Sequence, residues 1–435
     1  SLTYAGEWEG KHYTDKGTII DIEPGKLLHT TYYSSMSGKE DKPENYANVI
    51  YTLTEEDDKT KLTITQDNID TEEAKQHSIS NWQMVLQTLK ELAEKQELYA
   101  MDSITHAVLG ACIGEAVAGK QMGRRAMVWG MAAQSFPDID VVASFWMDTA
   151  GNLLAHRGFT HSILCMLLVT PLFALTAARL HRSRGVPLSR WMLLIGLNIF
   201  THLLLDSQNA YGTGLFEPFS HIRVAFNTLF VADPLFTIVA GIATIAMAMP
   251  RSKHKTRILW ARAGIICSAL YLGYCTVNKI MIDREVKHLL RKQHIAYDKK
   301  FVTPTPLNSM LWYVVATNDS GSYIGYRSIF DKRNDMPLYF FARNEALLKE
   351  AEDHESTQKL IRFSQGYYTA EKWGDTLVFN DLRFGQMGGW EYPDEKFVFH
   401  YFLHDSADNE MVIQRGRLKW DARSFKGLIA RIKGE

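Results

Sequence analysis

Four long apolar runs constrain the fold of this 435-residue chain more than any other feature. A helix needs about 20 predominantly apolar residues to cross the hydrocarbon core of a bilayer. A soluble helical bundle is the alternative, but the small number of charges in these runs argues against it. The sequence therefore predicts an all-α transmembrane helical bundle in the middle of the chain. The predicted spans are residues 162–180, 191–207, 229–249 and 258–280.

Two shorter apolar segments, residues 105–119 and 125–136, precede these runs and are rich in glycine and alanine. Each is shorter than the roughly 20 residues of a span. Small side chains allow the backbones of two helices to approach closely. We therefore expect two short helices that form a hairpin packed against the others.

Side chains that can bind metal ions gather at the ends of these segments. A charged side chain at the centre of a bilayer costs about 2.5–3.5 kcal/mol on insertion scales, so a cluster of them needs a compensating partner. Shared metal ions are the simplest such partner. We predict a site for one to three divalent metal ions, with Zn²⁺ as the first choice. The predicted ligands are His106, Asp138, Asp140, His156, His161, His202 and Asp206.

The spacing of these residues favours a shared site. His202 and Asp206 are four positions apart on an expected helix, so both project from one face. Asp138 and Asp140 follow Pro137, and in an extended segment both would project to the same side. Either both aspartates bind metal, or one of them orients a histidine that does. A solvated loop is the third interpretation.

The segment between His156 and His161 contributes a turn and a cation. Gly158 permits a tight turn. Arg157 can hold an anionic oxygen of a substrate, or it can form a salt bridge to one of the two aspartates. One aspartate is the candidate base or bridging ligand. The candidate catalytic residues are therefore Asp138, Asp140 and Arg157.

Three further residues are weaker candidates for the site. Asp233 lies within an apolar segment, where it either completes the site or pairs with Arg223. Glu217 and His221 lie in a loop that we expect at the same end of the helices.

Basic residues in short connections predict the orientation of the bundle, because lysine and arginine concentrate in cytoplasmic connections. Residues 179–190, residues 250–262 and the Arg124–Arg125 turn are all basic. We expect all three in the cytoplasm. The metal ligands, and the chain after Ile282, then lie on the opposite face of the membrane.

Composition excludes several function classes. The formal net charge of -1 gives no global basic bias, so we expect no nucleic-acid partner. The four cysteines all lie in apolar segments and form no C-x-x-C pair, which argues against a disulfide framework or a thiolate zinc site.

The chain on either side of the bundle has the pattern of α+β domains. In the first hundred residues we expect strands over 17–24, 27–35, 47–57 and 59–70, a tight turn at Asp57–Asp58, and a helix over 71–96 with Trp82 in the core. After residue 285 we expect a hairpin of 310–317 and 322–330, a helix over 343–372, strands over 375–385 and 396–405, and a helix near 418–433. The DLRFG motif at 381–385 either closes this last sheet or reaches the metal site.

Four motifs in the middle of the chain carry a family resemblance. MDSITHAVLGACIGEA, FPDID, HRGFTHS and THLLLDSQNAYGTG resemble, in this order, the YdjM family of inner-membrane, metal-dependent hydrolases. The resemblance implies a metal site at the seven predicted ligands, and it implies hydrolytic activity. It also implies that the protein lies in the bacterial inner membrane.

A second resemblance concerns the amino-terminal part. IEPGKLLHTTY and SNWQMVLQTLKELAE are similar to a START-like (SRPBCC) domain of the type found in activators of a heat-shock-protein ATPase. This family normally begins with a further strand and helices, so the resemblance implies only part of a helix-grip fold. The predicted organisation is a multidomain chain. It has an α+β helix-grip fragment at 1–98, the membrane-embedded hydrolase domain at 101–285, and a small α+β domain at 286–435.

The ligand types are also similar to those of zinc phospholipase C and the S1/P1-type nucleases. We therefore expect a membrane-bound hydrolase that cleaves a phosphoester, with a lipid among the candidate substrates, by means of a metal-activated water. The expected partners are membrane lipids and a small-molecule or lipid substrate. The alternative is a non-catalytic membrane binding or scaffold protein, with the START-like part as a ligand- or chaperone-binding module.

Overall fold

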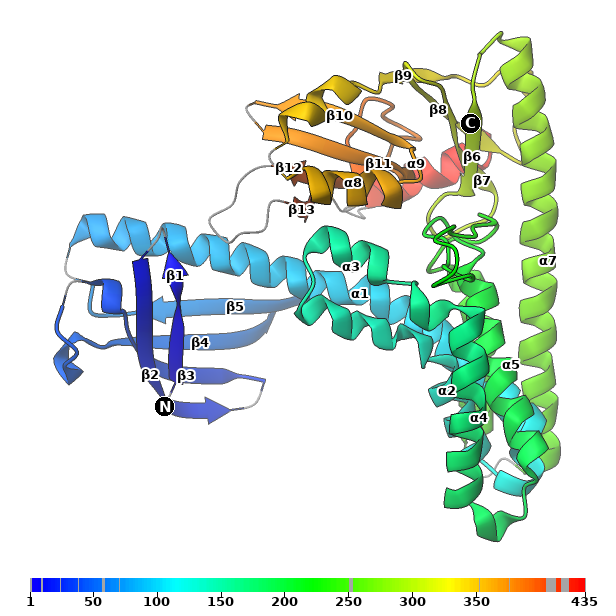
Figure 1. Cartoon of the computed structure of the whole chain (residues 1–435), viewed down its shortest axis with the longest axis horizontal. Helices are drawn as coiled ribbons and strands as arrows, with labels where there is room; N and C mark the ends of the chain where they lie inside the picture. Colours follow the sequence, from blue (N-terminus) through cyan, green and yellow to red (C-terminus); the bar gives the residue numbers. More distant parts are fainter. Residues whose placement is uncertain are drawn as a thin grey trace. The chain divides into compact units, whose positions relative to one another are not determined.

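A computed structural model shows how the chain is organised (Figure 1). It describes residues 2–8, 11–23, 25–37, 39–56, 59–69, 71–249, 253–351, 353–374, 376–403, 412–415 and 422–434. The chain divides into two compact units, Ser1–Gln96 and Glu97–Glu435. The predicted turn at Asp57–Asp58 lies outside the described residues. The predicted boundary at residue 285, inside the second unit, stays a prediction.

The first unit is a five-stranded antiparallel sheet in the order β1-β2-β3-β4-β5, followed by a helix. Its strands are β1 (Leu2–Trp8), β2 (Lys11–Glu23), β3 (Leu27–Tyr33), β4 (Ala47–Glu56) and β5 (Lys59–Gln66). Within this unit, the Trp82 indole donates a hydrogen bond of 2.7 Å to the Gln66 side chain, and its ring contacts Tyr51 edge-on. Trp82 thus anchors the helix on the sheet, in agreement with the helix-grip pattern.

The helix α1 runs from Glu72 to Met122 without a break. The sequence suggested two separate helices, over 71–96 and 105–119. The intervening residues contain no glycine or proline, so no helix-breaking residue separates the two segments.

The bundle contains three helices that are long and apolar enough to cross a membrane. They are α4 (Ile163–Leu180), α5 (Leu188–Asp206) and α7 (His254–Lys292). The predicted span at 229–249 is instead the shorter helix α6 (Pro234–Ala248), which has 15 residues. Such a helix is about 22 Å long, against a hydrocarbon core of about 30 Å. The helix begins late because Asp233 caps it and Pro234 occupies its first position.

Helices α1 and α2 (Arg125–Gln134) form the predicted hairpin, with Gly123 at the turn in a left-handed conformation (φ +60°). Their backbones are in direct contact. A Cβ atom added at Gly114 would lie 2.1 Å from the Ala126 carbonyl oxygen, and one at Gly130 would lie 2.0 Å from the Gly110 oxygen. The glycines are therefore required by the close approach that the sequence predicted.

The basic connections lie together at one end of the bundle. Arg124 at the α1–α2 turn donates hydrogen bonds to the carbonyls of Met247 and Met249 at the end of α6. The Trp129 indole of α2 donates to His181, which follows α4. The turn after α1 and the α4–α5 connection are both at the lower end in Figure 1. The opposite end carries the predicted metal ligands.

Two four-stranded antiparallel sheets form the carboxy-terminal part. One contains β6 (Lys299–Pro304), β7 (Leu311–Thr317), β8 (Gly321–Ser328) and β9 (Tyr339–Ala342). The other contains β10 (Tyr368–Trp373), β11 (Thr376–Gln386), β12 (Phe397–Leu403) and β13 (Val412–Arg415). The predicted hairpin is confirmed, because β7 and β8 pair from Leu311↔Ser328 to Thr317↔Ser322.

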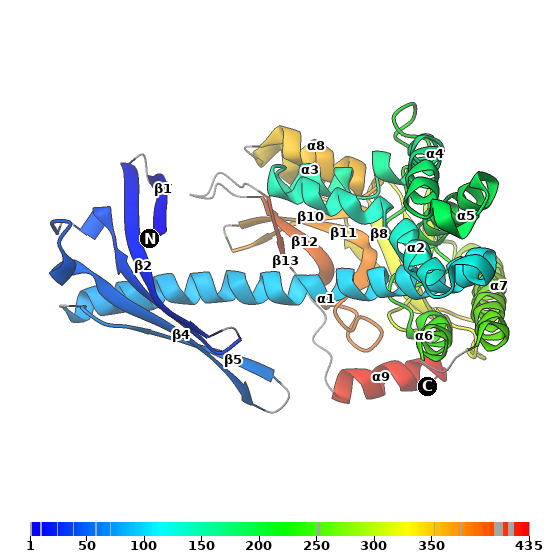
Figure 2. The same ribbon diagram turned by 90° about the horizontal axis from the view of Figure 1, so that it is seen from below.

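The helix predicted over 343–372 is wrong over most of its length. Only α8 (His354–Phe363) is an α-helix there. Asn344 and Gly366 have left-handed φ angles of 51° and +74°, on either side of α8. Residues 368–373 instead form β10, which pairs with β11 across a turn at Gly374. The last helix, α9 (Ala422–Ile432), is visible in Figure 2, and its Leu428 and Ile432 pack against Leu311 and Trp390.

Candidate metal centre

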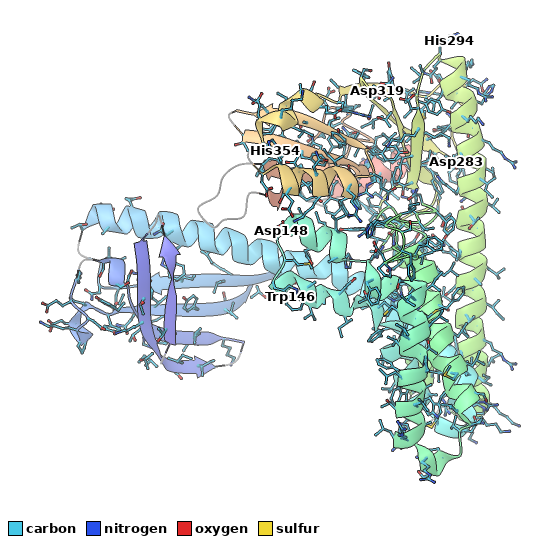
Figure 3. The ribbon with its side chains drawn as sticks, viewed as in Figure 1. Trp146, Asp148, Asp283, His294, Asp319 and His354 are labelled. Atoms are coloured by element: carbon cyan, nitrogen blue, oxygen red, sulfur yellow. The ribbon has the colours of Figure 1, made fainter. Side chains whose placement is uncertain are left out.

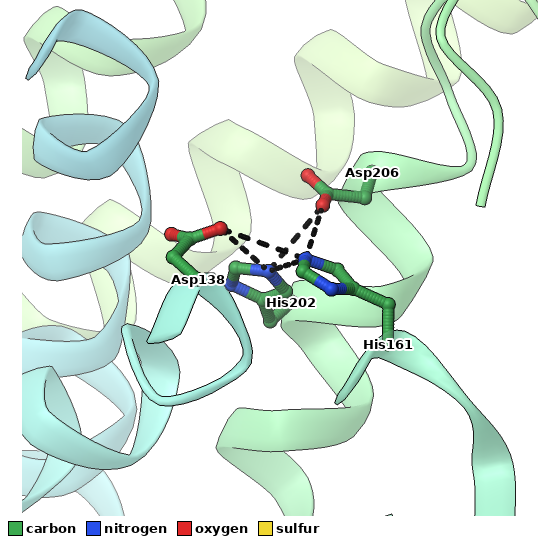
Figure 4. A group of neighbouring side chains, drawn as sticks. All are labelled: Asp138, His161, His202 and Asp206. Carbon is green, nitrogen blue, oxygen red and sulfur yellow. Dashed lines mark hydrogen bonds and ion pairs between the residues drawn. The ribbon is translucent and has the colours of Figure 1, made fainter. Parts of the chain in front are cut away.

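Four of the predicted ligands converge at the end of the bundle opposite the basic connections (Figure 4). Asp138, His161, His202 and Asp206 each offer one ligand atom, and these atoms lie within 4.8 Å of one another. His161, His202 and Asp206 are at most 1% exposed, whereas the Asp138 side chain is 26% exposed. Solvent therefore reaches this group on the side of Asp138.

The four ligand atoms have the mutual distances of a coordination polyhedron. The two histidine Nε2 atoms are 3.0 Å apart. Each of these nitrogens lies 3.5 Å from Asp138 Oδ1, and they lie 3.1 and 3.3 Å from Asp206 Oδ2. The edge of a tetrahedron around zinc is about 3.3 Å for metal–ligand distances of about 2.0–2.1 Å. Two imidazoles and two carboxylates with this spacing therefore fit a zinc ion without rearrangement.

Three elements bring these side chains together. Helix α5 supplies His202 and Asp206 from consecutive turns of one face, as their spacing predicted. His161 ends the short helix η4 (Phe159–His161), after which Ser162 caps α4 through the amide of Cys165. Asp138 comes from the 3₁₀ helix η3 (Pro137–Phe145).

The D-x-D motif does not form the extended segment that was expected. Pro137 begins the 3₁₀ helix η3, which has about three residues per turn, so residues two apart point in different directions. Asp138 points to the group of four. Asp140 instead lies 3.3 Å from His161 Nδ1 and 3.2 Å from His156 Nδ1. Asp140 is therefore the aspartate that orients a histidine, and Asp138 is the one placed to bind metal.

His106 and His156 stand beside the group of four. His106 Nε2 lies 3.1 Å from Asp206 Oδ1, and its ring stacks on His202 with centroids 3.9 Å apart. The two oxygens of Asp206 thus face different histidines, one inside the group of four and one beside it. His156 reaches the group through Asp140, and its ring lies edge-on to that of His161 with centroids 6.3 Å apart. The structure therefore brings all seven predicted ligands into one network but gives four of them a common centre.

Arg157 contacts Asp206, which was not among the partners considered from the sequence. Its Nε lies 3.1 Å from Asp206 Oδ2, and its Nη1 donates a hydrogen bond of 2.6 Å to Asn209. Its backbone amide donates to Asp140 Oδ2 over 2.7 Å, while its φ of 57° is left-handed. Because Arg157 is only 2% exposed, it is better placed to fix Asp206 than to contact a substrate.

Charge around the centre keeps the carboxylates ionised. Burial would raise the pKa of Asp138, but the imidazoles of His202 and His161 outweigh burial and hold this pKa below its ordinary value. Burial would also raise the pKa of Asp140, and His156 and His161 lower it in the same way. Both aspartates are therefore available as metal or histidine partners at neutral pH.

The weaker candidates lie outside this network. Asp233 caps α6 by accepting from the amides of Leu235 and Phe236, and it accepts a 2.9 Å hydrogen bond from the Tyr271 hydroxyl. Among the described contacts it neither joins the centre nor pairs with Arg223. Glu217 and His221 pair with each other over 2.8 Å, and His221 is exposed.

Two residues that support the centre were missed from the sequence. Asn209 accepts from Arg157, and the Tyr211 ring lies 5.3 Å from the Arg157 guanidinium. Both belong to the THLLLDSQNAYGTG motif, which was the available signal. Tyr211 in turn packs against Phe384 of the DLRFG motif, with centroids 4.8 Å apart. The DLRFG motif therefore lies in β11 and also contacts Tyr211, one of the residues that support the centre.

Comparison with known proteins agrees with both resemblances. Residues 101–282 match the model of the YdjM inner membrane protein family, and residues 2–94 match that of the Activator of Hsp90 ATPase homolog 1-like protein family. YfhP of Bacillus subtilis (strain 168) is 28% identical over 315 residues, which cover 67% of this chain and 89% of that protein.

Two further relatives match shorter stretches. The inner membrane protein YbcI of Escherichia coli (strain K12) is 32% identical over 133 residues, covering 28% of this chain and 75% of that protein. The solution structure of ChR145 from Cytophaga hutchinsonii is 40% identical, covers 22% of this chain and 64% of that one, and has a TM-score of 0.20. The chain therefore belongs to the YdjM family. It is an inner membrane protein, and three of its helices are long and apolar enough to cross a membrane.

Proposed function

We propose that this protein is a metal-dependent hydrolase that cleaves a phosphoester at the centre formed by Asp138, His161, His202 and Asp206. The carrying observation is the spacing of their ligand atoms, all within 4.8 Å of one another in a buried network. Two imidazoles and two carboxylates in a near-tetrahedral arrangement are a ligand set that suits Zn²⁺. When bound, a zinc ion supplies Lewis acidity and lowers the pKa of a coordinated water to about 7.

The residues around the centre have distinct tasks in this proposal. His161 and His202 present Nε2 to the common centre, while Asp140 fixes the His161 ring through Nδ1. Arg157 holds Asp206 in place. Asp138, as the partly exposed member, is the side chain at which water and a substrate reach the centre.

The proposal is tested first by metal content. The full chain is purified in detergent without added metal, and bound metals are quantified by mass spectrometry. We expect one or more zinc ions per chain in the parent, and a clear loss in His202→Ala. His221→Ala is the matched control because His221 is exposed and outside the network. Metal-free parent protein, or equal metal content in the two variants, would contradict the proposal.

The second test asks whether the centre is open to a substrate. Four protein ligands are also typical of closed, structural zinc sites, whereas catalytic sites keep a position for water. We expect the absorption spectrum of the Co²⁺-substituted protein to change when inorganic phosphate is added, together with metal-dependent cleavage of aryl phosphate esters. A spectrum indifferent to phosphate, with no hydrolysis, would favour the scaffold alternative.

A further inference from the structure

A cavity separate from the metal centre opens between α8 and the segment that precedes α4. It has a volume of about 510 Å³, and its walls include Trp146, Phe159, Lys359 and Arg362. A smaller cavity of about 230 Å³ adjoins it, sharing Arg362 and adding Arg223. Helix α3 (Thr149–Ala155) lies beside α8 in both ribbon views (Figures 1 and 2), and Figure 3 labels Trp146 and Asp148 beneath α8.

The acidic residues of the cavity already have partners. Asp148 accepts hydrogen bonds from the amide of Gly151 at 3.0 Å, the hydroxyl of Ser356 at 3.2 Å and the ammonium of Lys359 at 3.4 Å. The other acid, Glu217, pairs with a histidine of the same wall. Both carboxylates therefore already have partners in the wall of the cavity.

The two arginines of the cavity differ from the acids in this respect. Within the described ranges, neither Arg223 nor Arg362 forms an ion pair with a carboxylate. Arg223 is held by main-chain carbonyls, donating to Leu154 over 2.6 Å and to His156 over 2.9 Å. The Arg362 side chain is exposed. Three cations and two carboxylates line the two cavities together, so positive charge is in excess.

Further arginines reinforce this positive charge. Burial, together with the nearby charges of Arg383 and Arg157, lowers the pKa of Arg223 to about 10. Arg157 is compensated by Asp206, and Arg383 by Asp381 at 2.6 Å. Glu217 offsets part of this effect on the pKa of Arg223. Among the described residues neither Arg223 nor Arg362 has a carboxylate at ion-pair distance, so an anion in the cavity would be stabilised by both.

Large apolar side chains surround the mouth of the cavity. Trp146 and Phe159 line the larger cavity and Ile222 the smaller one, and they are 69%, 48% and 69% exposed. They lie close to the start of the α4 span. The amide of Ile163, the first residue of α4, donates a hydrogen bond of 3.0 Å to the carbonyl of Leu215, in the loop that leads to Ile222. Aromatic residues at the end of a span are typical of the headgroup level of a bilayer.

We propose that this cavity binds the phosphate of a membrane phospholipid headgroup. Arg362 donates to the phosphate oxygens, Arg223 supplies a second positive charge, and the acyl chains run along the exposed aromatic rim. A free phosphate would need the cations but not the rim, so the rim argues for the lipid. The site is separate from the metal centre and does not depend on hydrolysis there.

The test uses the full chain in detergent and short-chain dihexanoylphosphatidylglycerol, with bound lipid counted by native mass spectrometry. We expect Arg362→Gln to weaken lipid binding about tenfold, through the loss of a charge-assisted hydrogen bond. Lys359→Gln should weaken it too, because Asp148 then remains uncompensated. Arg333→Gln is the matched control, since Arg333 is exposed on the same domain and does not line either cavity. Binding equal to the control in both cavity variants would overturn the proposal.

A competition experiment separates the lipid from free phosphate. Dihexanoylphosphatidylglycerol should bind more tightly than inorganic phosphate, and Trp146→Gln should weaken only the lipid. Equal binding of both ligands, unaffected by Trp146→Gln, would assign the cavity to free phosphate and overturn the lipid proposal. Metal content is measured on the same samples. It should match the parent in every variant, so a failure of this proposal is distinguishable from a failure of the proposed metal centre.

Discussion

At the scale of single residues, Asp140 shows how a carboxylate can serve a metal centre without binding the metal. It lies against Nδ1 of both His156 and His161 and accepts from the Arg157 amide. These contacts fix the His161 ring so that Nε2 faces the common centre. A histidine with a fixed ring loses less entropy when it binds a metal ion, and the carboxylate raises its basicity.

We therefore expect Asp140→Asn to retain metal but to lower the metal affinity about 10- to 100-fold, the usual cost of removing such a partner. The asparagine oxygen can still accept from one neighbour, so the fold should persist. Affinity is measured by competition with a chromophoric chelator. Asp298→Asn is the control, because Asp298 is exposed and distant in sequence from the centre. Unchanged affinity in Asp140→Asn would show that the contact with His161 has no part in metal binding.

The residue scale also marks the limit of prediction from sequence. Helix periodicity was sufficient to place His202 and Asp206 on one face, because both belong to a regular helix. The roles of Asp138 and Asp140 stayed open between two arrangements, because their directions depend on a short 3₁₀ helix that no apolar pattern announces. Two partners of Arg157, Asn209 and Tyr211, lie in the loop after α5, and helix periodicity does not predict where a loop places its side chains.

At the scale of elements, the contact between α1 and α2 depends on glycine at both helices. We expect Gly114→Ala to destabilise the bundle by about 1–3 kcal/mol, the usual cost of overpacking. The new Cβ would lie 2.1 Å from the Ala126 oxygen, which is main chain and cannot rotate away. The measurement is the thermal unfolding midpoint in detergent.

Gly241→Ala in α6 is the matched control for this prediction. A Cβ there has no atom within 4 Å, and alanine favours a helix over glycine by about 0.5–1 kcal/mol. This variant should be as stable as the parent or more so. A midpoint for Gly114→Ala equal to that of Gly241→Ala would contradict the close packing of α1 on α2.

The elements themselves were predictable where hydropathy or alternation is sustained. Three of the four predicted spans and the β7–β8 hairpin meet this condition. The helix predicted over 343–372 failed because the chain turns at both ends of α8. The sequence does not announce that Asn344 and Gly366 adopt left-handed conformations on either side of α8. Helix α1 is longer than predicted because no glycine or proline lies between its two predicted segments. Helix α6 is shorter than predicted because it begins only at Pro234, after the Asp233 cap.

At the scale of the second unit, the carboxy-terminal sheets and the metal centre share one end of the bundle. Tyr211, beside the centre, packs into the same core as Ala150 and Leu153 of α3 and Phe379 and Tyr401 of the second sheet. The Arg157 guanidinium also lies over the Tyr211 ring. The second sheet therefore supports the residue that holds Asp206, and the two parts must lie on the same side of the membrane.

The basic connections lie at the other end, so the structure gives a topology prediction. We expect Ser183→Cys, in the α4–α5 connection, to react with a membrane-impermeant thiol reagent only after the inner membrane of spheroplasts is broken. Asp319→Cys, in the exposed turn between β7 and β8, should react in intact spheroplasts. The physical reason is the preference of arginine-rich connections for the cytoplasm. The parent chain controls for its native cysteines, of which Cys267 is exposed. The reverse labelling would invert the orientation, and labelling of both positions from one side would contradict the arrangement of the spans.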